Sequence, residues 1–173
     1  MLRSSVRYFA RNILATAPGI YDHLPTQTTR FRSTLPIYQS AVCAGLIKNQ
    51  IPIPLGGSSS SMLDAAVLVE ELYAAEPSTA LTILGTGLGL TPLILAGNRE
   101  QHERLLKPFT RQEGERLASF VHSEPGGTAN WLHVGSMGLQ TTAYKDGDEW
   151  IVNGEKVRRP SRPDTSLYTI ESV

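Results

Sequence analysis

The chain has 173 residues, 40% of them apolar and 18% charged, which is enough for one ordinary globular core with a small second unit attached. With 16 basic and 16 acidic residues the net charge is zero, so no overall field would concentrate nucleic acid or an anionic membrane. The single cysteine, Cys43, excludes an internal disulfide and favours an intracellular protein, cytoplasmic or mitochondrial. Its apolar neighbours predict a buried side chain.

The first predicted helix runs from the N-terminus to about Thr16 and ends before Pro18 and Gly19. Apolar residues follow helical spacing along one face. Three arginines recur every four residues on another face and are expected to form a solvated stripe: Arg3, Arg7 and Arg11. A mitochondrial transit peptide is the alternative, because no acidic residue precedes Asp22.

Further helices follow in close succession, which indicates a bundle. One spans about residues 30–48, and the breaker-rich loop 51–60 separates it from the next block. Ser61 and Asp64 resemble a capping box for a helix that ends before Pro77. The remaining capping signals are Ser78 at the start of the next helix, Gly97 as its left-handed end, and Asn98 with Gln101 before a last helix that ends near Lys107.

The segment 77–98 carries no charge and is long enough to span a bilayer. Its glycines, proline and hydroxyl residues dilute the apolar content, so a helix buried in a protein core is favoured over a membrane span. Gly85-Thr86-Gly87-Leu88-Gly89 lacks the spacing and the preceding strand of a nucleotide-binding loop. Glycines on such a helix are expected to let a neighbouring backbone or a ligand approach closely.

Beyond Gly114 the periodicity changes from helical to alternating. Residues 117–122 and 139–145 are predicted strands, and the turn Asp146-Gly147-Asp148 leads into a return strand, 149–152. Asn153-Gly154 is a strong hairpin signal and predicts a third strand from Glu155. The sequence therefore predicts a β-region that begins after the helices.

The most informative motif is SFVHSEPGGTAN, at residues 119–130. A strand that ends in an aromatic residue and a Ser-Glu-Pro run with a glycine-containing turn resembles the signature of the acyl-CoA dehydrogenase/oxidase flavoprotein family. Other stretches resemble the family in the same order: Pro52–Gly57, Gly87–Gly89, Ala96–Gln101, Leu139–Ala143, Gly147–Glu149 and Asn153–Lys156. The resemblance covers residues 6–156.

This resemblance implies an α+β fold. An N-terminal all-α helical bundle domain, 1–114, would precede a partial antiparallel middle β-domain, 115–157. The tail, 158–173, departs from the family, because Arg158, Arg159 and Pro160 stand where an aromatic-aliphatic-Thr run is usual, and it is predicted to be disordered. The family's C-terminal four-helix domain, which carries the catalytic base, has no counterpart in this sequence.

The resemblance also implies FAD as the cofactor. Phe120, His122 and Ser123 match positions that pack against or hydrogen-bond the flavin ring, and Thr128 and Ala129 match the glycine and serine of the turn. A hydroxyl and exposed backbone N–H groups suit the polar edge of an isoalloxazine. Ala129 lacks the usual hydroxyl, and His122 replaces a small aliphatic residue, so both departures weaken the site.

Glu124 is expected to cap backbone N–H groups and not to act as a base, so no catalytic residue is assigned. The implied activity is α,β-dehydrogenation of acyl-CoA thioesters, with an acyl-CoA-type substrate as partner and an oligomer in full-length members. Lacking the base, this chain is expected to be inactive. A non-catalytic binding or interaction fragment and an unstable shortened gene product are the alternatives. The four histidines show no metal-site spacing, so no metal is expected.

Overall fold

The computed structural model describes residues 2–125, 135 and 138–156. It divides into two compact units, Met1–Phe120 and Val121–Val173, which are treated separately below. The predicted tail, 158–173, lies outside the described residues. The same holds for Thr128 and Ala129 of the predicted cofactor site.

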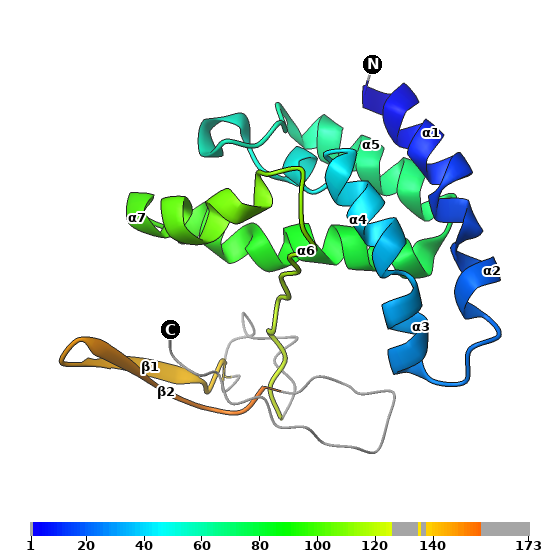
Figure 1. Ribbon diagram of the computed structural model, residues 1–173. Helices are drawn as coiled ribbons and strands as arrows, with labels where there is room; N and C mark the ends of the chain where they lie inside the picture. The colour runs from blue at the N-terminus through cyan, green and yellow to red at the C-terminus, as the bar shows by residue number, and fades with distance from the viewer. Residues whose placement is uncertain (1, 126–134, 136–137, 157–173) are drawn as a thin grey trace. The chain divides into compact units, whose positions relative to one another are not determined.

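The first unit is all helical (Figure 1). It consists of α-helices of very different lengths, and short 3₁₀ turns connect several of them. Their bounds are α1 Leu2–Asn12, η1 Leu14–Thr16, α2 Ala17–Tyr21, α3 Gln27–Ser33, α4 Leu35–Cys43, η2 Lys48–Gln50, η3 Ile53–Leu55, α5 Met62–Tyr73, α6 Pro77–Ala96, α7 Arg99–Gln101, the π-helical η4 His102–Leu106, and η5 Lys107–Phe109.

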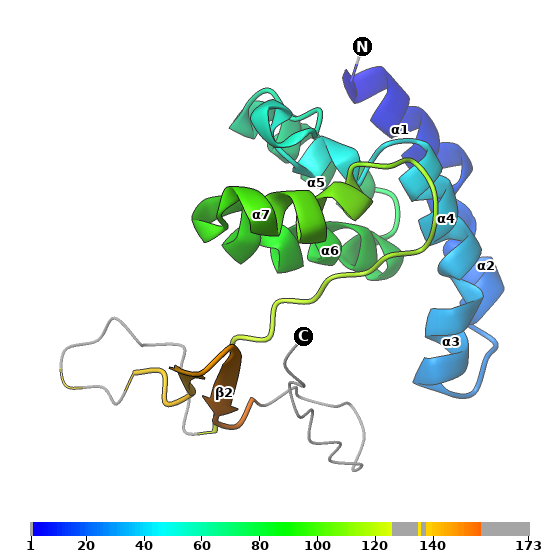
Figure 2. The same cartoon turned by 60° about the vertical axis from the view of Figure 1, so that its left-hand side comes forward.

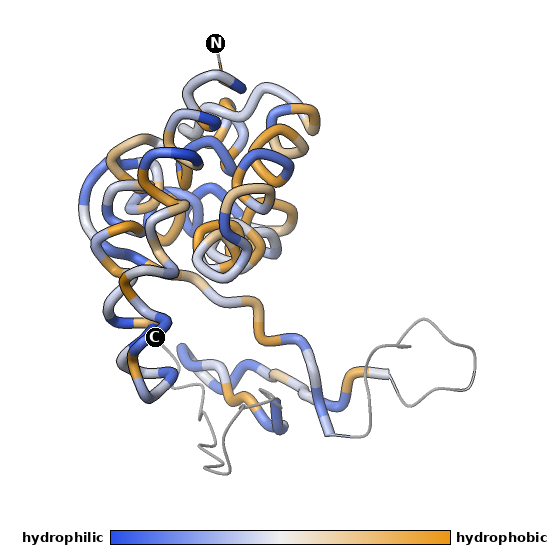
Figure 3. Tube along the Cα trace, turned by 90° about the vertical axis from the view of Figure 1, so that its right-hand side faces the viewer, coloured by the Kyte–Doolittle hydropathy of each residue, from blue (hydrophilic) through white to orange (hydrophobic). Residues whose placement is uncertain are grey.

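The main core lies among α1, α4, α5 and α6. Figure 3 shows hydrophobic and hydrophilic residues interspersed along the helices, as expected for helices that bury one face. Side chains with almost no exposed surface fill this core, among them Val6, Leu14, Tyr38, Leu68, Leu72 and Ile83. A second, smaller cluster consists of Ile51, Leu90 and Leu106. The prediction of a helical bundle is therefore confirmed.

Two details near the N-terminus differ from the sequence-based expectation. The first helix, α1, ends at Asn12, and Pro18 lies in the first turn of α2, a position to which proline is well suited. Cys43 is exposed at the end of α4, although its apolar neighbours predicted burial. The apolar stretch there is shared between two faces of the helix, and Ala41 and Val42 are the residues that enter the core.

The arginines of α1 are not simply solvated. Arg7 donates from Nε to Glu71 Oε2 at 2.8 Å and from Nη2 to Glu71 Oε1 at 2.7 Å. Arg3 contacts both Glu70, at 2.7 Å, and Glu71, at 3.0 Å. Glu71 is buried, and its pKa is lowered chiefly by the hydrogen bond from Arg7. These ion pairs fasten α1 to α5, which lie beside each other in Figure 1.

The boundaries of α6 also correct the prediction. Its N-cap is Glu76, whose carboxylate accepts from the N–H groups of Ser78 at 2.8 Å and Thr79 at 2.7 Å, so Ser78 is not the cap. Gly97 has φ −67° and is not left-handed. The capping interaction of Asn98 with Gln101 is present as predicted, with both distances at 2.9 Å.

Two glycines of α6 lie where other parts of the chain come very close to the helix. A Cβ at Gly87 would lie 2.0 Å from Gln50 Oε1, and one at Gly89 would lie 2.6 Å from the backbone of Ala118 and Ser119. The neighbour of Gly89 is backbone, the neighbour of Gly87 is the end of a side chain, and Gly85 has open space around it. The expectation that a neighbouring backbone approaches these glycines is therefore confirmed for Gly89 alone.

By length and composition α6 could cross a membrane, a test that the core helix of a soluble protein also passes. A third of its apolar window is buried, including Ala80, Ile83 and Leu90. Leu81, Leu88 and Leu95, spaced by seven residues, are exposed. The helix thus contributes one face to the core and leaves an apolar stripe on another.

The second unit contains one antiparallel hairpin, formed by β1 Thr142–Asp146 and β2 Glu149–Asn153. Gly147 has φ 60° at the first position of the two-residue turn, where glycine is favoured because of the positive φ. The predicted strand 117–122 has no ladder partner among the described residues, and neither have residues 154–156. Strand periodicity alone cannot form a strand, because a ladder needs a paired neighbour.

Candidate functional site

The signature motif is organised around a buried carboxylate. Glu124 is 5% exposed. Its Oε2 accepts from Gln140 N at 2.5 Å, and its Oε1 accepts from Thr141 N at 3.0 Å. Those two residues lie directly before β1, so the carboxylate joins the start of the signature turn to the start of the hairpin. The predicted role of Glu124, capping of backbone N–H groups, is confirmed.

Lys156 completes this arrangement from the far side of the hairpin. Its Nζ lies 2.7 Å from Glu124 Oε1 and 3.2 Å from the carbonyl oxygen of His122. The Lys156 side chain is 15% exposed and that of Glu124 is 2% exposed. One ammonium group therefore binds both the side chain and the backbone of the motif.

The electrostatic consequence is a strongly acidic carboxyl group. The hydrogen bond from Lys156, followed by those from Thr141 and Gln140, lowers the pKa of Glu124 to about 2. Glu124 is thus ionised at neutral pH, with its oxygens engaged by three donors. A carboxylate in this state is a weak base, so the expectation that Glu124 is not the catalytic base has a physical reason.

Sequence reasoning noticed Lys156 only as part of the Asn-Gly-x-Lys pattern and gave it no role. The usable signal was a motif pair: an acid in the signature turn and a lysine at the end of the hairpin, both in stretches that resemble one family. Gly154, two residues earlier, lets the chain pass close to Thr141, since a Cβ there would lie 2.4 Å from Thr141 Oγ1. Gly154 therefore serves close packing.

The predicted flavin contacts that the structure describes are partly exposed. Phe120, at the end of the first unit, is 45% exposed. In the second unit, Ser123 is exposed and its hydroxyl makes no hydrogen bond to the described part of the chain, while His122 is half-buried. Val121, between them, is 49% exposed.

These features fit a flavin. A planar apolar ring needs an apolar surface beside it, and its polar edge needs a donor that is not already used within the protein. Within the second unit, the exposed Val121 and Ser123 present one group of each kind. Thr128 and Ala129 lie outside the described residues, and within the described ranges no group of three metal-ligating side chains occurs.

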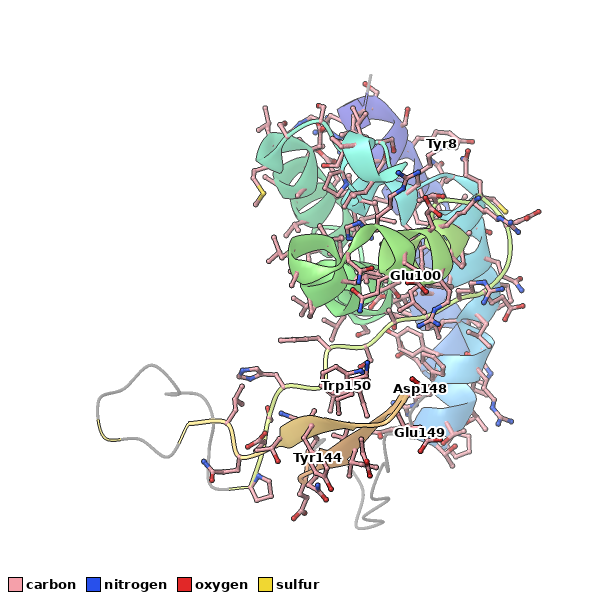
Figure 4. The ribbon with its side chains drawn as sticks, turned by 90° about the vertical axis from the view of Figure 1, so that its left-hand side faces the viewer. Tyr8, Glu100, Tyr144, Asp148, Glu149 and Trp150 are labelled. Carbon is pink, nitrogen blue, oxygen red and sulfur yellow. The ribbon has the colours of Figure 1, made fainter. Side chains whose placement is uncertain are left out.

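Figure 4 shows the hairpin side chains, with Tyr144 on β1 and Trp150 on β2. They are 55% and 56% exposed, respectively. The residues around Glu124, not the hairpin surface, therefore form the buried part of this unit.

Comparison with known proteins identifies the family. Residues 1–113 match the family model described as "Acyl-CoA dehydrogenase, N-terminal domain". Nitroalkane oxidase of Fusarium oxysporum is 50% identical over 155 residues, which cover 90% of this chain and 35% of that protein. The human mitochondrial short-chain specific acyl-CoA dehydrogenase is 34% identical over 113 residues, 65% of this chain and 26% of that protein.

Solved structures agree with this. A nitroalkane oxidase active-site mutant crystallised with 1-nitrooctane is 50% identical, with a TM-score of 0.82, over 90% of this chain and 36% of that one. An acyl-CoA dehydrogenase complexed with FAD from Bacillus anthracis is 26% identical, with a TM-score of 0.68, over 90% of this chain and 25% of that one. The chain thus spans about a third of the length of the nitroalkane oxidases it matches. The helical unit, the signature turn and these matches together show that the chain belongs to the acyl-CoA dehydrogenase family.

Proposed function

We propose that the chain supplies the helical unit and the flavin-facing turn of an FAD-dependent oxidoreductase whose substrate is a nitroalkane. The observation that carries this proposal is the difference in similarity within one family. The nitroalkane oxidase of Fusarium oxysporum is 50% identical over 90% of the chain, whereas the human acyl-CoA dehydrogenase is 34% identical over 65%. The exposed Phe120 and Ser123 supply groups suited to the flavin ring.

The second candidate is α,β-dehydrogenation of an acyl-CoA thioester, which the resemblance in the sequence implied. The acyl-CoA dehydrogenase name of the matched domain model favours it. Both reactions remove a proton from a carbon next to an electron-withdrawing group and pass electrons to the flavin, so both require a positioned base. They differ in the group that the site must accommodate, a small nitro group or a bulky thioester.

We also propose that the 173-residue chain by itself does not catalyse the oxidation of a substrate. Glu124, the carboxylate nearest the proposed flavin contacts in sequence, is ionised and bound by Lys156 and by two backbone N–H groups. The proposed contribution of this chain is therefore cofactor contact and scaffold. We assign these two roles to the two proposed domains. Residues 1–114 would form the scaffold, and residues 115–157 would face the flavin.

A chimera tests the substrate class. Residues 2–156 replace the matching segment of the Fusarium nitroalkane oxidase, and the purified flavoprotein is mixed without oxygen with 1-nitrohexane or with butyryl-CoA. Loss of the yellow absorbance of oxidised flavin with 1-nitrohexane alone is expected. Bleaching by butyryl-CoA alone would show that the acyl-CoA reading is right, and the unmodified host enzyme is the control for cofactor content.

The isolated chain tests the cofactor role. Flavin fluorescence is titrated with the purified 173-residue protein, and quenching is expected at micromolar protein concentration. A folded, colourless protein that leaves the fluorescence unchanged would favour the alternative of a non-catalytic interaction fragment. Cleavage of both units at the same rate by a trace of protease would favour the unstable gene product.

A further inference from the structure

We propose that Tyr38 and Gly89 are positioning residues that fasten the segment 115–119 to α4 and α6 and so fix where the chain leaves the helical unit. Phe120 and the signature motif follow this segment directly. Its importance for flavin binding rests on the proposed function, but the attachment itself does not. Figure 2 shows the segment after η5 looping toward α4 and returning along α6.

Polar contacts attach this segment, and Gln112 shortly before it, at successive points along α4. Gln112 Nε2 donates to the carbonyl oxygen of Cys43 at 2.9 Å, and Gln39 donates to the carboxylate of Glu115. The hydroxyl of Tyr38 donates to the carbonyl oxygen of Arg116 at 2.6 Å. An irregular segment without a ladder partner is thus held through side chains of the helical unit.

Tyr38 is the buried member of these contacts, with 1% of its surface exposed. Its hydroxyl oxygen also lies 3.1 Å from Thr86 Oγ1 on α6, and Thr86 is equally buried. Burial raises the pKa of Tyr38, so the hydroxyl keeps its proton and remains a donor. Arg116 is exposed, so the buried partner in this contact is the hydroxyl of Tyr38, and its loss would remove the bond that holds the Arg116 backbone to α4.

Gly89 provides the second attachment. The backbone of Ala118 and Ser119 occupies the space that a Cβ at position 89 would need, only 2.6 Å from it. The side chain of Ala118 packs against the smaller apolar cluster, which includes Leu90 and Leu106. The missing side chain on α6 thus forms a notch that receives the segment, and the notch fixes its position along the helix.

Two alanine substitutions in α6 distinguish the attachment of the segment from an effect on the stability of the helix. Gly89→Ala and Gly85→Ala raise helix propensity equally, but only the first clashes with the segment, because Gly85 has nothing within 4 Å. The intact 173-residue protein is digested with trace trypsin, and cleavage after Arg116 is followed by mass spectrometry. Since cleavage follows the population of the opened segment, Gly89→Ala should raise its rate about tenfold and Gly85→Ala should not.

Equal rates in the two variants would overturn the proposal. It would also fail if cleavage after Arg32, in α3, rose by the same factor, because Gly89 would then serve the stability of the whole helical unit.

A second pair of variants tests the hydroxyl group of Tyr38. Tyr38→Phe should raise cleavage after Arg116 about fivefold, the effect of one lost hydrogen bond, while Tyr8→Phe should change nothing. Tyr8 is 68% exposed on α1 and is labelled in Figure 4.

Flavin titration of the same variants then distinguishes the two proposals. Weaker flavin binding by Gly89→Ala than by Gly85→Ala supports a positioning role for the proposed cofactor site. If no variant binds flavin, the wild-type chain included, the proposed function fails while the protease result still decides the attachment. If flavin affinity is identical in all variants despite faster cleavage, the positioning role is wrong.

Discussion

Lys156 Nζ lies 2.7 Å from Glu124 Oε1, although 32 positions separate the two residues in the chain. The same carboxylate accepts the N–H groups of Gln140 and Thr141. The start of the signature motif, the entry to β1 and the exit from β2 therefore meet at one buried anion. Holding the start of the motif in place suits the proposed cofactor contact, because loosely held donors lose binding energy to ordering.

Removing the ammonium group should change the acidity of Glu124. In Lys156→Met the carboxylate keeps its backbone donors but loses the largest cause of its lowered pKa. We expect its pKa to rise from about 2 toward the ordinary value of 4.5. A carbon NMR titration of the glutamate side chains measures this, with Lys145→Met on the exposed face of β1 as control. An unchanged pKa would mean that the ion pair does not form in solution.

The pH dependence of the second unit follows from the same group. A carboxyl whose pKa is lower in the folded than in the unfolded protein adds stability above the unfolded pKa, here about 4.5. That contribution should disappear as the pH falls from about 4.5 toward 2. In the folded protein, the amide proton shifts of Gln140 and Thr141 should titrate around pH 2, where Glu124 itself takes up a proton. In Glu124→Gln they should stay constant, and titration that persists there would assign the change to another group.

Local signals in the sequence predicted much of the helical unit. The capping interaction of Asn98 with Gln101 was predicted because both partners lie within one turn of the helix. A close approach of some neighbouring chain to Gly89 was expected, but the sequence did not indicate which one. The partner is the backbone at Ala118, 29 positions away, and no local signal links the two residues. Lys156 was missed as a site residue for the same reason.

The errors have a common physical cause. Ser78 was expected to cap α6, but the helix already begins at Pro77, so Glu76 is the N-cap and its carboxylate accepts from two of the unpaired N–H groups of the first turn. Residues 117–122 have strand periodicity, yet a strand needs neighbours, and no partner occurs among the described residues. Propensity predicts what a segment can form, while its contacts decide what it does form.

The ion pairs between α1 and α5 should contribute unequally to the thermal stability of the helical unit. Glu71, with a side chain 9% exposed, accepts from both Arg3 and Arg7, whereas Glu70, 62% exposed, contacts Arg3 only. Glu71→Gln should therefore lower the melting temperature of the helical unit clearly more than Glu70→Gln, because Glu71 is a buried carboxylate bound by two arginines, whereas an exposed ion pair contributes little. Circular dichroism melts measure both. Equal shifts would show that α1 is held by its apolar face alone.

Packing in the main core predicts a large effect at one position of α5 and a small one nearby. Leu68 has no exposed surface, whereas Leu63 on the same helix is 70% exposed. Leu68→Ala should cost about 2–5 kcal/mol through lost burial and the cavity left behind. Leu63→Ala should cost less than about 0.5 kcal/mol. Urea unfolding measures both, and similar midpoints for the two variants would contradict the packing seen here.

The proposed flavin contact predicts a difference between two serines of one segment. Ser123 and Ser119 are both exposed, but only Ser123 is among the proposed flavin contacts. Loss of one hydrogen bond should weaken flavin binding about fivefold in Ser123→Ala, since such a bond contributes about 1 kcal/mol. Ser119→Ala should bind as the wild type does. Fluorescence titration with FAD measures both affinities. An equal loss of affinity in the two variants would show that the Ser123 hydroxyl does not bind the flavin.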